Sequence, residues 1–101
     1  MKVFISQPMR GLTGEQILDQ RARGLAFVRE NFPNENIELI DTFFPDFNGN
    51  RLEFLGKSIL DGLAKADLAL FIGKYKKYDG CAVEHTAAVR YGVRRLYFDQ
   101  K

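Results

Sequence analysis

Residues 68–73 form a continuous apolar run that ends in a glycine: Leu68-Ala69-Leu70-Phe71-Ile72-Gly73. The length of this run and the turn residues around it predict a buried β-strand. A short basic loop separates it from Tyr78-Asp79-Gly80-Cys81-Ala82-Val83-Glu84-His85. We expect a helix there from about residue 81 to residue 91, ended by Gly92. A strand thus leads into a helix that carries a carboxylate in its opening turns.

Glu84 is the first candidate for a functional residue because of this placement. In an open parallel α/β sheet, the carboxyl ends of the strands and the amino ends of the following helices enclose a ligand crevice, and Gly80 lets the backbone approach a substrate. The alternative is that Glu84 only interacts favourably with the helix dipole, as acidic residues early in helices commonly do.

Strands and helices alternate along the whole chain. The apolar patterns predict strands over 2–6, 36–40, 68–72 and 93–98, and helices from Thr13 to just before Pro33 and over 52–66 and 81–91. Such alternation implies right-handed crossovers between parallel strands. We therefore predict one α/β domain over residues 1–101. Its expected fold is a small doubly wound, flavodoxin-like or Rossmann-like three-layer sandwich, with a mainly parallel four-stranded sheet in the order 2-1-3-4.

The composition argues against several classes of function. With one cysteine and one histidine among 101 residues, the chain has no internal disulfide and no plausible cysteine and histidine metal site, and we expect no cofactor. A net charge of +2 is too small for the footprint of a polynucleotide-binding protein. The apolar stretch at residues 1–6 is too short for a signal peptide or a membrane span. These features predict a cytoplasmic protein without a membrane partner.

The strand order 2-1-3-4 would place the loop 7–11 opposite the loop 74–80, across one crevice. Asp67 begins the third strand and falls at the other end of the sheet, where a structural role is expected. Asp79 and Glu84 fall at the ligand end.

Arg10 lies in the loop after the first strand, where its guanidinium could hold a phosphate in a bidentate contact. The alternative is that Arg10 is a solvated loop residue that binds no ligand. Pro8 and Gly11 stiffen and open this loop, and Met9 offers a soft apolar surface to a base.

Cys81 and His85 lie one helical turn apart. A lone cysteine is more often a small buried residue than a nucleophile, and we expect that role for Cys81. His85 is expected at or near the surface, although its position beside Glu84 leaves a role in proton transfer open.

Four landmarks add a further signal: Val3-Phe4-Ile5-Ser6-Gln7-Pro8-Met9-Arg10-Gly11, Leu63-Ala64-Lys65-Ala66-Asp67, the strand through Ile72, and Asp79-Gly80-Cys81-Ala82-Val83-Glu84 followed by Ala88 and Gly92. In their order and spacing they resemble the nucleoside 2-deoxyribosyltransferase superfamily. That family includes the deoxynucleoside 5'-monophosphate N-glycosidases and small, often phage-associated relatives. The resemblance covers nearly the whole chain.

The resemblance implies that Glu84 is a nucleophile that attacks C1' of a deoxyribose. It also implies that residues of the first strand and its loop contact base and sugar: Phe4, Gln7, Pro8, Met9, Arg10 and Gly11. Tyr78 and Gly80 would hold the sugar or its phosphate, and Asp79 could assist. Family members often complete their sites with a neighbouring subunit, so the resemblance further implies a homodimer or a larger homo-oligomer.

Several positions depart from the family pattern. Phe4 stands where the family usually has a tyrosine whose hydroxyl orients the nucleophile. A helix acid that recurs as a catalytic partner matches Ile59, with Ser58 and Asp61 as the nearest polar substitutes. We therefore name Asp61 as a third catalytic candidate, reached by a shift in register. Tyr78 stands where the family often has a serine, and Thr86 stands where it usually has a glycine.

Three functions remain open from the sequence. The first is an N-glycosidic bond hydrolase or transferase acting on a nucleoside or deoxynucleotide. The second is a catalytically impaired module of the same fold that senses or sequesters a nucleotide. The third is an interaction protein in which Glu84 only caps its helix and the aromatic loop with Phe43, Phe44 and Phe47 meets a partner.

Overall fold

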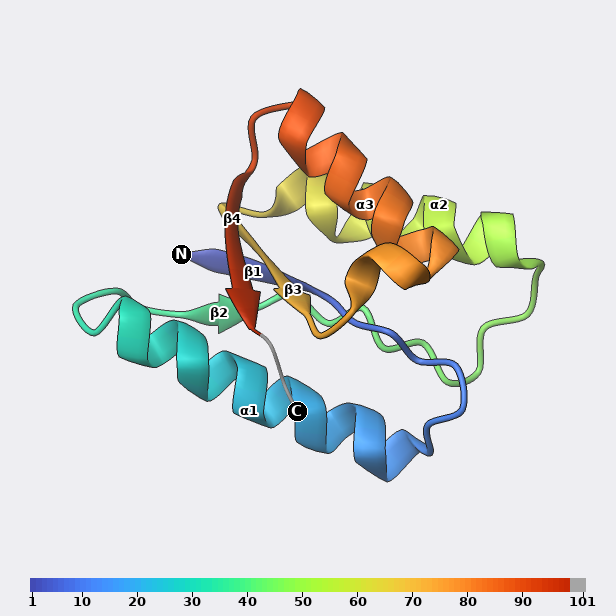
Figure 1. The fold of residues 1–101 in the computed structure, drawn as a ribbon, viewed down its shortest axis with the longest axis horizontal. Coiled ribbons are helices and arrows are strands. Elements are labelled where there is room, and N and C mark those ends of the chain that lie inside the picture. Colours follow the sequence, from blue (N-terminus) through green and yellow to red (C-terminus); the bar gives the residue numbers. More distant parts are fainter. Residues whose placement is uncertain (99–101) are drawn as a thin grey trace.

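The computed structural model describes residues 1–98 and shows a parallel β-sheet between two layers of helices (Figure 1). The elements in chain order are β1 (Lys2–Ser6), α1 (Gly14–Asn31), β2 (Glu38–Leu39), α2 (Arg51–Asp61), a 3₁₀ turn η1 (Leu63–Lys65), β3 (Leu68–Ile72), a 3₁₀ turn η2 (Tyr75–Lys77), α3 (Asp79–Arg90) and β4 (Arg94–Phe98).

All four strands are parallel, and their order is β2-β1-β3-β4. Helix α1 covers one face of the sheet, whereas α2 and α3 cover the other (Figure 1). This confirms the predicted doubly wound α/β fold with the strand order 2-1-3-4. Because β1 and β3 are neighbours whose connections leave toward opposite faces, a crevice opens at their carboxyl ends.

The two faces of the sheet have separate cores. Alternate residues of β3 contribute to each, since side chains of a strand point to opposite faces. Leu68, Leu70 and Ile72 pack with Val28 of α1, whereas Ala69 and Phe71 pack with Ala88 of α3, among other residues. All five residues of β3 are buried, which explains why this strand is uninterruptedly apolar.

The boundaries of two helices differ from the prediction. Helix α3 begins at Asp79 instead of about residue 81, so Asp79 and Gly80 belong to its first turn. Helix α2 ends at Asp61 instead of reaching residue 66. Leu52, the first residue of the helix predicted over 52–66, is 76% exposed. Strand β2 has only two residues, Glu38–Leu39.

Gly62 explains why α2 stops. A Cβ atom at this position would lie 2.5 Å from the carbonyl oxygen of Ser58 and 2.7 Å from side-chain atoms of both Phe4 and Thr42. The chain can pass this closely over β1 only without a side chain, and the helix gives way there to the turn η1.

We predict that Gly62→Ala destabilises the protein by about 1–3 kcal/mol, because the new methyl group meets backbone as well as buried side chains. The control is Gly14→Ala in the first turn of α1, where the nearest atom to the new Cβ is 3.7 Å away. That variant should change stability by less than about 0.5 kcal/mol. Urea unfolding of both variants measures the difference, and equal effects would contradict the close approach at Gly62.

Candidate functional site

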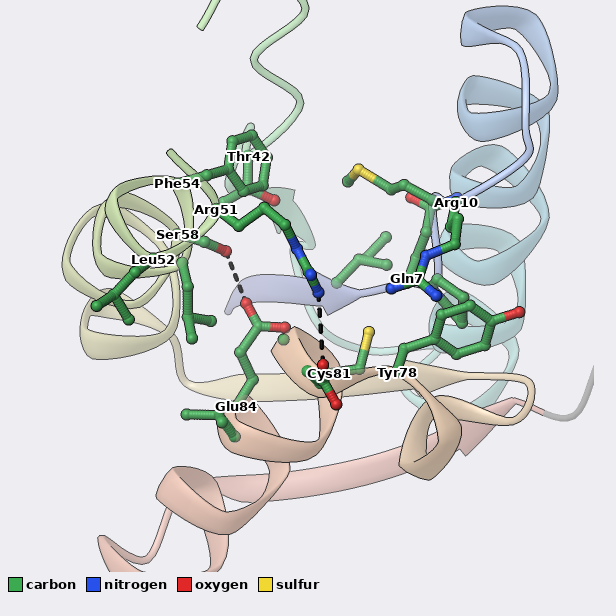
Figure 2. A pocket seen from close by; sticks show the side chains of 17 residues that line it. Gln7, Arg10, Thr42, Arg51, Leu52, Phe54, Ser58, Tyr78, Cys81 and Glu84 are labelled. Carbon is green, nitrogen blue, oxygen red and sulfur yellow. Dashed lines mark hydrogen bonds and ion pairs between the residues drawn. The ribbon is translucent and has the colours of Figure 1, made fainter. Parts of the chain in front are cut away.

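A cavity of about 480 Å³ lies at the carboxyl end of β1, between the loop that follows this strand, helix α2 and the first turns of α3 (Figure 2). Its walls are mainly apolar, with a few polar side chains among them. The lining residues are Ile5, Gln7, Pro8, Met9, Arg10, Thr42, Arg51, Leu52, Phe54, Leu55, Ser58, Tyr78, Asp79, Gly80, Cys81, Val83 and Glu84. Small-molecule sites have this size and this mixture of residues.

Glu84 is the buried carboxylate of the cavity, with only 6% of the residue exposed. The Ser6 hydroxyl, at the end of β1, donates a hydrogen bond of 2.7 Å to Oε1 of Glu84. The Ser58 hydroxyl, on α2, donates one of 2.8 Å to Oε2, as the dashed line to Glu84 in Figure 2 shows. Three elements therefore fix both oxygens of one carboxylate.

Burial raises the pKa of Glu84 above its usual range. The hydrogen bonds from Ser6 and Ser58 and the positive charge of Arg21 oppose this rise, since each stabilises the ionised form. The result is a carboxylate that is poorly solvated yet held in a defined orientation. Such a group is a stronger base and nucleophile than a carboxylate in water.

Arg21 is a second buried charge, on the inner face of α1. Its Nη2 donates a hydrogen bond of 3.1 Å to the hydroxyl of Thr42, which lines the cavity. Its Nε and Nη1 have no hydrogen-bond partner among residues 1–98. Burial lowers the pKa of Arg21, and the charges of Asp41 and Glu84 counteract that shift. Arg21 thus supplies positive charge behind the wall of the cavity.

Most of the predicted site residues come together at this cavity. Gln7, Pro8, Met9 and Arg10 line one side, and Tyr78, Asp79, Gly80 and Glu84 line another. Figure 2 shows Gln7 and Arg10 on the side opposite α2. The Gln7 amide nitrogen donates hydrogen bonds of 3.0 Å to the Ile17 carbonyl and to Gln20, so the loop after β1 is anchored to α1.

Asp79 lies at the mouth of the cavity instead of beside Glu84. Its side chain is 87% exposed and pairs with Arg51 of α2, with 3.5 Å between their nearest charged atoms. An exposed pair at this distance contributes little to stability.

The structure does not bring Phe4, Gly11 and Asp61 to the cavity lining. Phe4 is fully buried in the core beneath α3, because its β1 side chain points to that face of the sheet. Asp61 forms an ion pair of 2.8 Å with Lys57 one turn earlier on α2. The proposed register shift that would make Asp61 a catalytic partner is therefore not present, and Ser58 occupies the corresponding place beside Glu84.

The sequence patterns did not predict a role for Ser6, Arg21 or Arg51. Arg21 could have been found, because Ile17, Arg21, Gly24 and Val28 share the buried side of α1 and an arginine stands out in that series. The bond from Ser6 to Glu84 spans 78 residues and depends on the sheet register, which no local pattern encodes.

The side chains of Cys81 and His85 have different surroundings, although the two residues lie one helical turn apart. Cys81 lines the cavity, and burial raises the pKa of its thiol to about 11, so it is protonated at neutral pH. His85 instead packs against Phe71 and Tyr75, and its Nε2 lies 2.9 Å from the Tyr97 hydroxyl. Burial and nearby positive charges lower the pKa of His85.

The aromatic loop packs mainly against the protein itself. Phe44 and Phe47 contact Phe54 of α2, with ring centroids 5.8 and 5.4 Å apart. Phe54 in turn lines the cavity, so the loop supports one wall of the site.

Comparisons with family models, with curated proteins and with solved structures gave no match to this chain. Among residues 1–98, no three histidine, cysteine, aspartate or glutamate side chains gather in a way that could hold a metal ion. No helix in that part of the chain is long and apolar enough to cross a membrane.

The raised pKa of Glu84 predicts a dependence of stability on pH. An acid with a raised pKa in the folded state contributes full stability below its unfolded pKa of about 4.5, and this contribution is lost as the pH rises through the folded value. Glu84→Gln should therefore unfold at a higher temperature than the native protein at pH 8, and the difference should disappear toward pH 4. Thermal unfolding across this range measures it.

Glu30→Gln, which removes an exposed carboxylate near the end of α1, is the matched control and should show no such trend. A native protein that gains stability over Glu84→Gln as the pH rises would contradict the raised pKa.

Proposed function

We propose that this protein cleaves or transfers the base of a 2'-deoxynucleoside or of its 5'-monophosphate, with Glu84 as the nucleophile. The observation that carries the proposal is the Glu84 carboxylate, buried in a cavity of about 480 Å³ and held by Ser6 and Ser58. A cavity of this size accommodates a nucleotide. The resemblance of the sequence to the deoxyribosyltransferase superfamily supports the same chemistry.

The proposed reaction has two steps. An oxygen of Glu84 bonds to C1' of the sugar while the bond from C1' to the base breaks. The base leaves with the electron pair and takes up a proton from solvent, and the water or base that attacks in the second step gives up a proton to solvent. Because this transition state carries positive charge at C1', a carboxylate stabilises it and then traps the sugar as an ester. Water, or a second base, then attacks C1' and releases Glu84. Water gives hydrolysis and a second base gives transfer.

The start of α3 supports a ligand with a phosphate. Tyr78, at the N-cap of α3, makes no side-chain capping hydrogen bond, so it leaves the first amides of the helix uncovered by its own side chain. Gly80 in the first turn lines the cavity, as do Arg10 and Arg51 from two other segments. Helix amino ends and arginine side chains both bind anions. A 5'-phosphate would meet these groups while C1' lies near Glu84.

A binding module is the second candidate function, and one observation favours it. Asp79 is exposed and paired with Arg51, and Asp61 lies outside the cavity, so neither carboxylate stands beside Glu84 as a second acid. Departure of the base needs a proton donor. In this alternative the protein holds a nucleotide in the same cavity without breaking its glycosidic bond.

We further propose that the protein acts in the cytoplasm as a homodimer or larger homo-oligomer. A domain of 101 residues buries a limited share of its apolar surface alone, and association increases that share.

The first test is turnover of a panel of deoxynucleosides and their 5'-monophosphates, with and without an acceptor base, followed by chromatography of the free or exchanged base. Glu84→Gln should reduce turnover by about three orders of magnitude or more, because it removes the nucleophile. Glu30→Gln should retain full activity. Absence of turnover by the native protein, together with thermal stabilisation by one nucleotide, would reject the enzyme and support the binding module.

The second test concerns the acid side of the pH profile. Protonation of Glu84 abolishes its nucleophilicity, so kcat/KM should fall as the pH drops through its pKa. Ser58→Ala removes a hydrogen bond that stabilises the ionised form, and therefore should move this fall to higher pH. Thr86→Ala, an exposed change on α3, should leave the profile in place. An unmoved profile in Ser58→Ala would contradict Glu84 as the titrating group.

A further inference from the structure

Arg21 is a buried cation with very few partners. Only 3% of the residue is exposed, and it forms no ion pair with residues 1–98. It donates one hydrogen bond, to Thr42, and its Nε and Nη1 have no partner in that part of the chain. A charge buried in this way lowers the stability of a fold, and an apolar side chain of similar length would not. The charge therefore indicates a role beyond packing.

Thr42 connects this charge to the cavity. It is buried and belongs to the cavity lining, on the same side as α2 and across from Arg10 (Figure 2). Its hydroxyl oxygen accepts the hydrogen bond of 3.1 Å from Arg21, so the hydroxyl hydrogen remains to be donated. No residue among 1–98 accepts that hydrogen. Arg21 thus polarises a hydroxyl that can donate to a ligand, since hydrogen bonds in such a chain strengthen one another.

We propose that Thr42, with Arg21 behind it, stabilises the negative charge that the base acquires as it leaves. This inference rests on the proposed reaction and names its substrate class as a pyrimidine, in which a 2-carbonyl group adjoins the glycosidic nitrogen. With a 5'-phosphate at the start of α3 and C1' at Glu84, the base would extend toward the remaining wall of the cavity. Thr42 and Phe54 help to form that wall.

The step takes no proton from the protein. As the bond from C1' to N1 of the base breaks, its electron pair moves onto the base, and part of the charge moves onto the 2-carbonyl oxygen. The Thr42 hydroxyl donates a hydrogen bond to this oxygen, Arg21 stays protonated, and the base takes its proton from solvent afterwards. A donor already oriented toward developing charge acts strongly between mainly apolar walls, because no water competes for it.

This arrangement explains how a base could leave without a second acid. Asp79 is exposed and Asp61 lies outside the cavity lining. Burial raises the pKa of the Cys81 thiol to about 11, so this group is too weak an acid at neutral pH. A purine leaves readily once an acid protonates its N7, whereas a pyrimidine can leave as an anion that a hydrogen bond stabilises. The cavity therefore suits a pyrimidine better.

The test compares kcat for 2'-deoxyuridine and 5-fluoro-2'-deoxyuridine, as nucleosides and as 5'-monophosphates. Fluorine stabilises the departing anion and so reduces the need for Thr42. Thr42→Val should lower kcat by about a hundredfold for the deoxyuridine substrate but only by about tenfold for its fluoro derivative. Thr42→Ser keeps the hydroxyl and should retain the native ratio of the two rates.

Arg21 would be a positioning residue, and a double variant tests this role. Arg21→Met should lower kcat more for the deoxyuridine substrate than for its fluoro derivative, with little change in KM. Adding Arg21→Met to Thr42→Val should lower kcat no further, because Arg21 acts through Thr42. The rates are compared at a pH that ionises Glu84 in every variant, since Arg21 also favours the ionised form of Glu84.

Thr86→Val and Arg29→Met are the matched controls, because they make the same changes at exposed positions of α3 and α1. Both should leave the two rates unchanged. Circular dichroism shows whether each variant folds, and Arg21→Met alone decides the result if Thr42→Val does not fold.

Two kinds of failure are distinguishable. Equal losses on both substrates in Thr42→Val or Arg21→Met would overturn the role of these residues while leaving the reaction at Glu84 in place. Turnover of purine substrates only would do the same. Absence of any turnover by the native protein would instead reject the proposed reaction, and this inference with it.

Discussion

The geometry of the site depends on one buried carboxylate that joins three parts of the chain. Glu84 comes from α3, and its two oxygens accept hydrogen bonds from Ser6 at the end of β1 and from Ser58 on α2. A buried charge without such partners would destabilise the fold by several kcal/mol. The two serines thus allow the cavity to contain an ionisable group, and the carboxylate in turn sets the distance between β1 and α2. For the proposed reaction, function and stability oppose each other, since burial would make the carboxylate more reactive and disfavours its charged form.

The arrangement of strands and helices could be predicted from the sequence, whereas the hydrogen bonds of the site could not. Runs such as residues 68–72 are apolar because both faces of the sheet are covered, and this pattern is local. The hydrogen-bond partners of Glu84 are not encoded locally, because they come from distant parts of the chain. The family resemblance implies a tyrosine at Phe4 and an acid near Ile59. In the structure the hydroxyl groups that contact Glu84 come instead from Ser6, two residues after Phe4 in β1, and from Ser58. Two residues along a strand preserve the face, which is why Ser6 and Phe4 point the same way.

Helix α2 connects the cavity to the rest of the fold. Ser58 on this helix contacts Glu84, and Leu52, Phe54 and Leu55 line the cavity. The aromatic loop packs on Phe54 from the same helix, and Gly62 ends the helix directly over Phe4 and Thr42. A substitution in α2 can therefore alter the cavity even where the replaced side chain does not line it. Leu52 is exposed because it lies where the cavity meets the outer surface.

The distances along the chain between the partners of Glu84 have a consequence for the order of folding. Ser58 and Ser6 precede Glu84 by 26 and 78 residues, and closing the longer loop carries the larger entropic penalty. During synthesis, β1 and α2 leave the ribosome before α3, so Ser6 and Ser58 are present before the carboxylate of Glu84. The site therefore cannot assemble piece by piece as the chain grows. The proposed reaction can begin only after α3 has packed against β1 and α2.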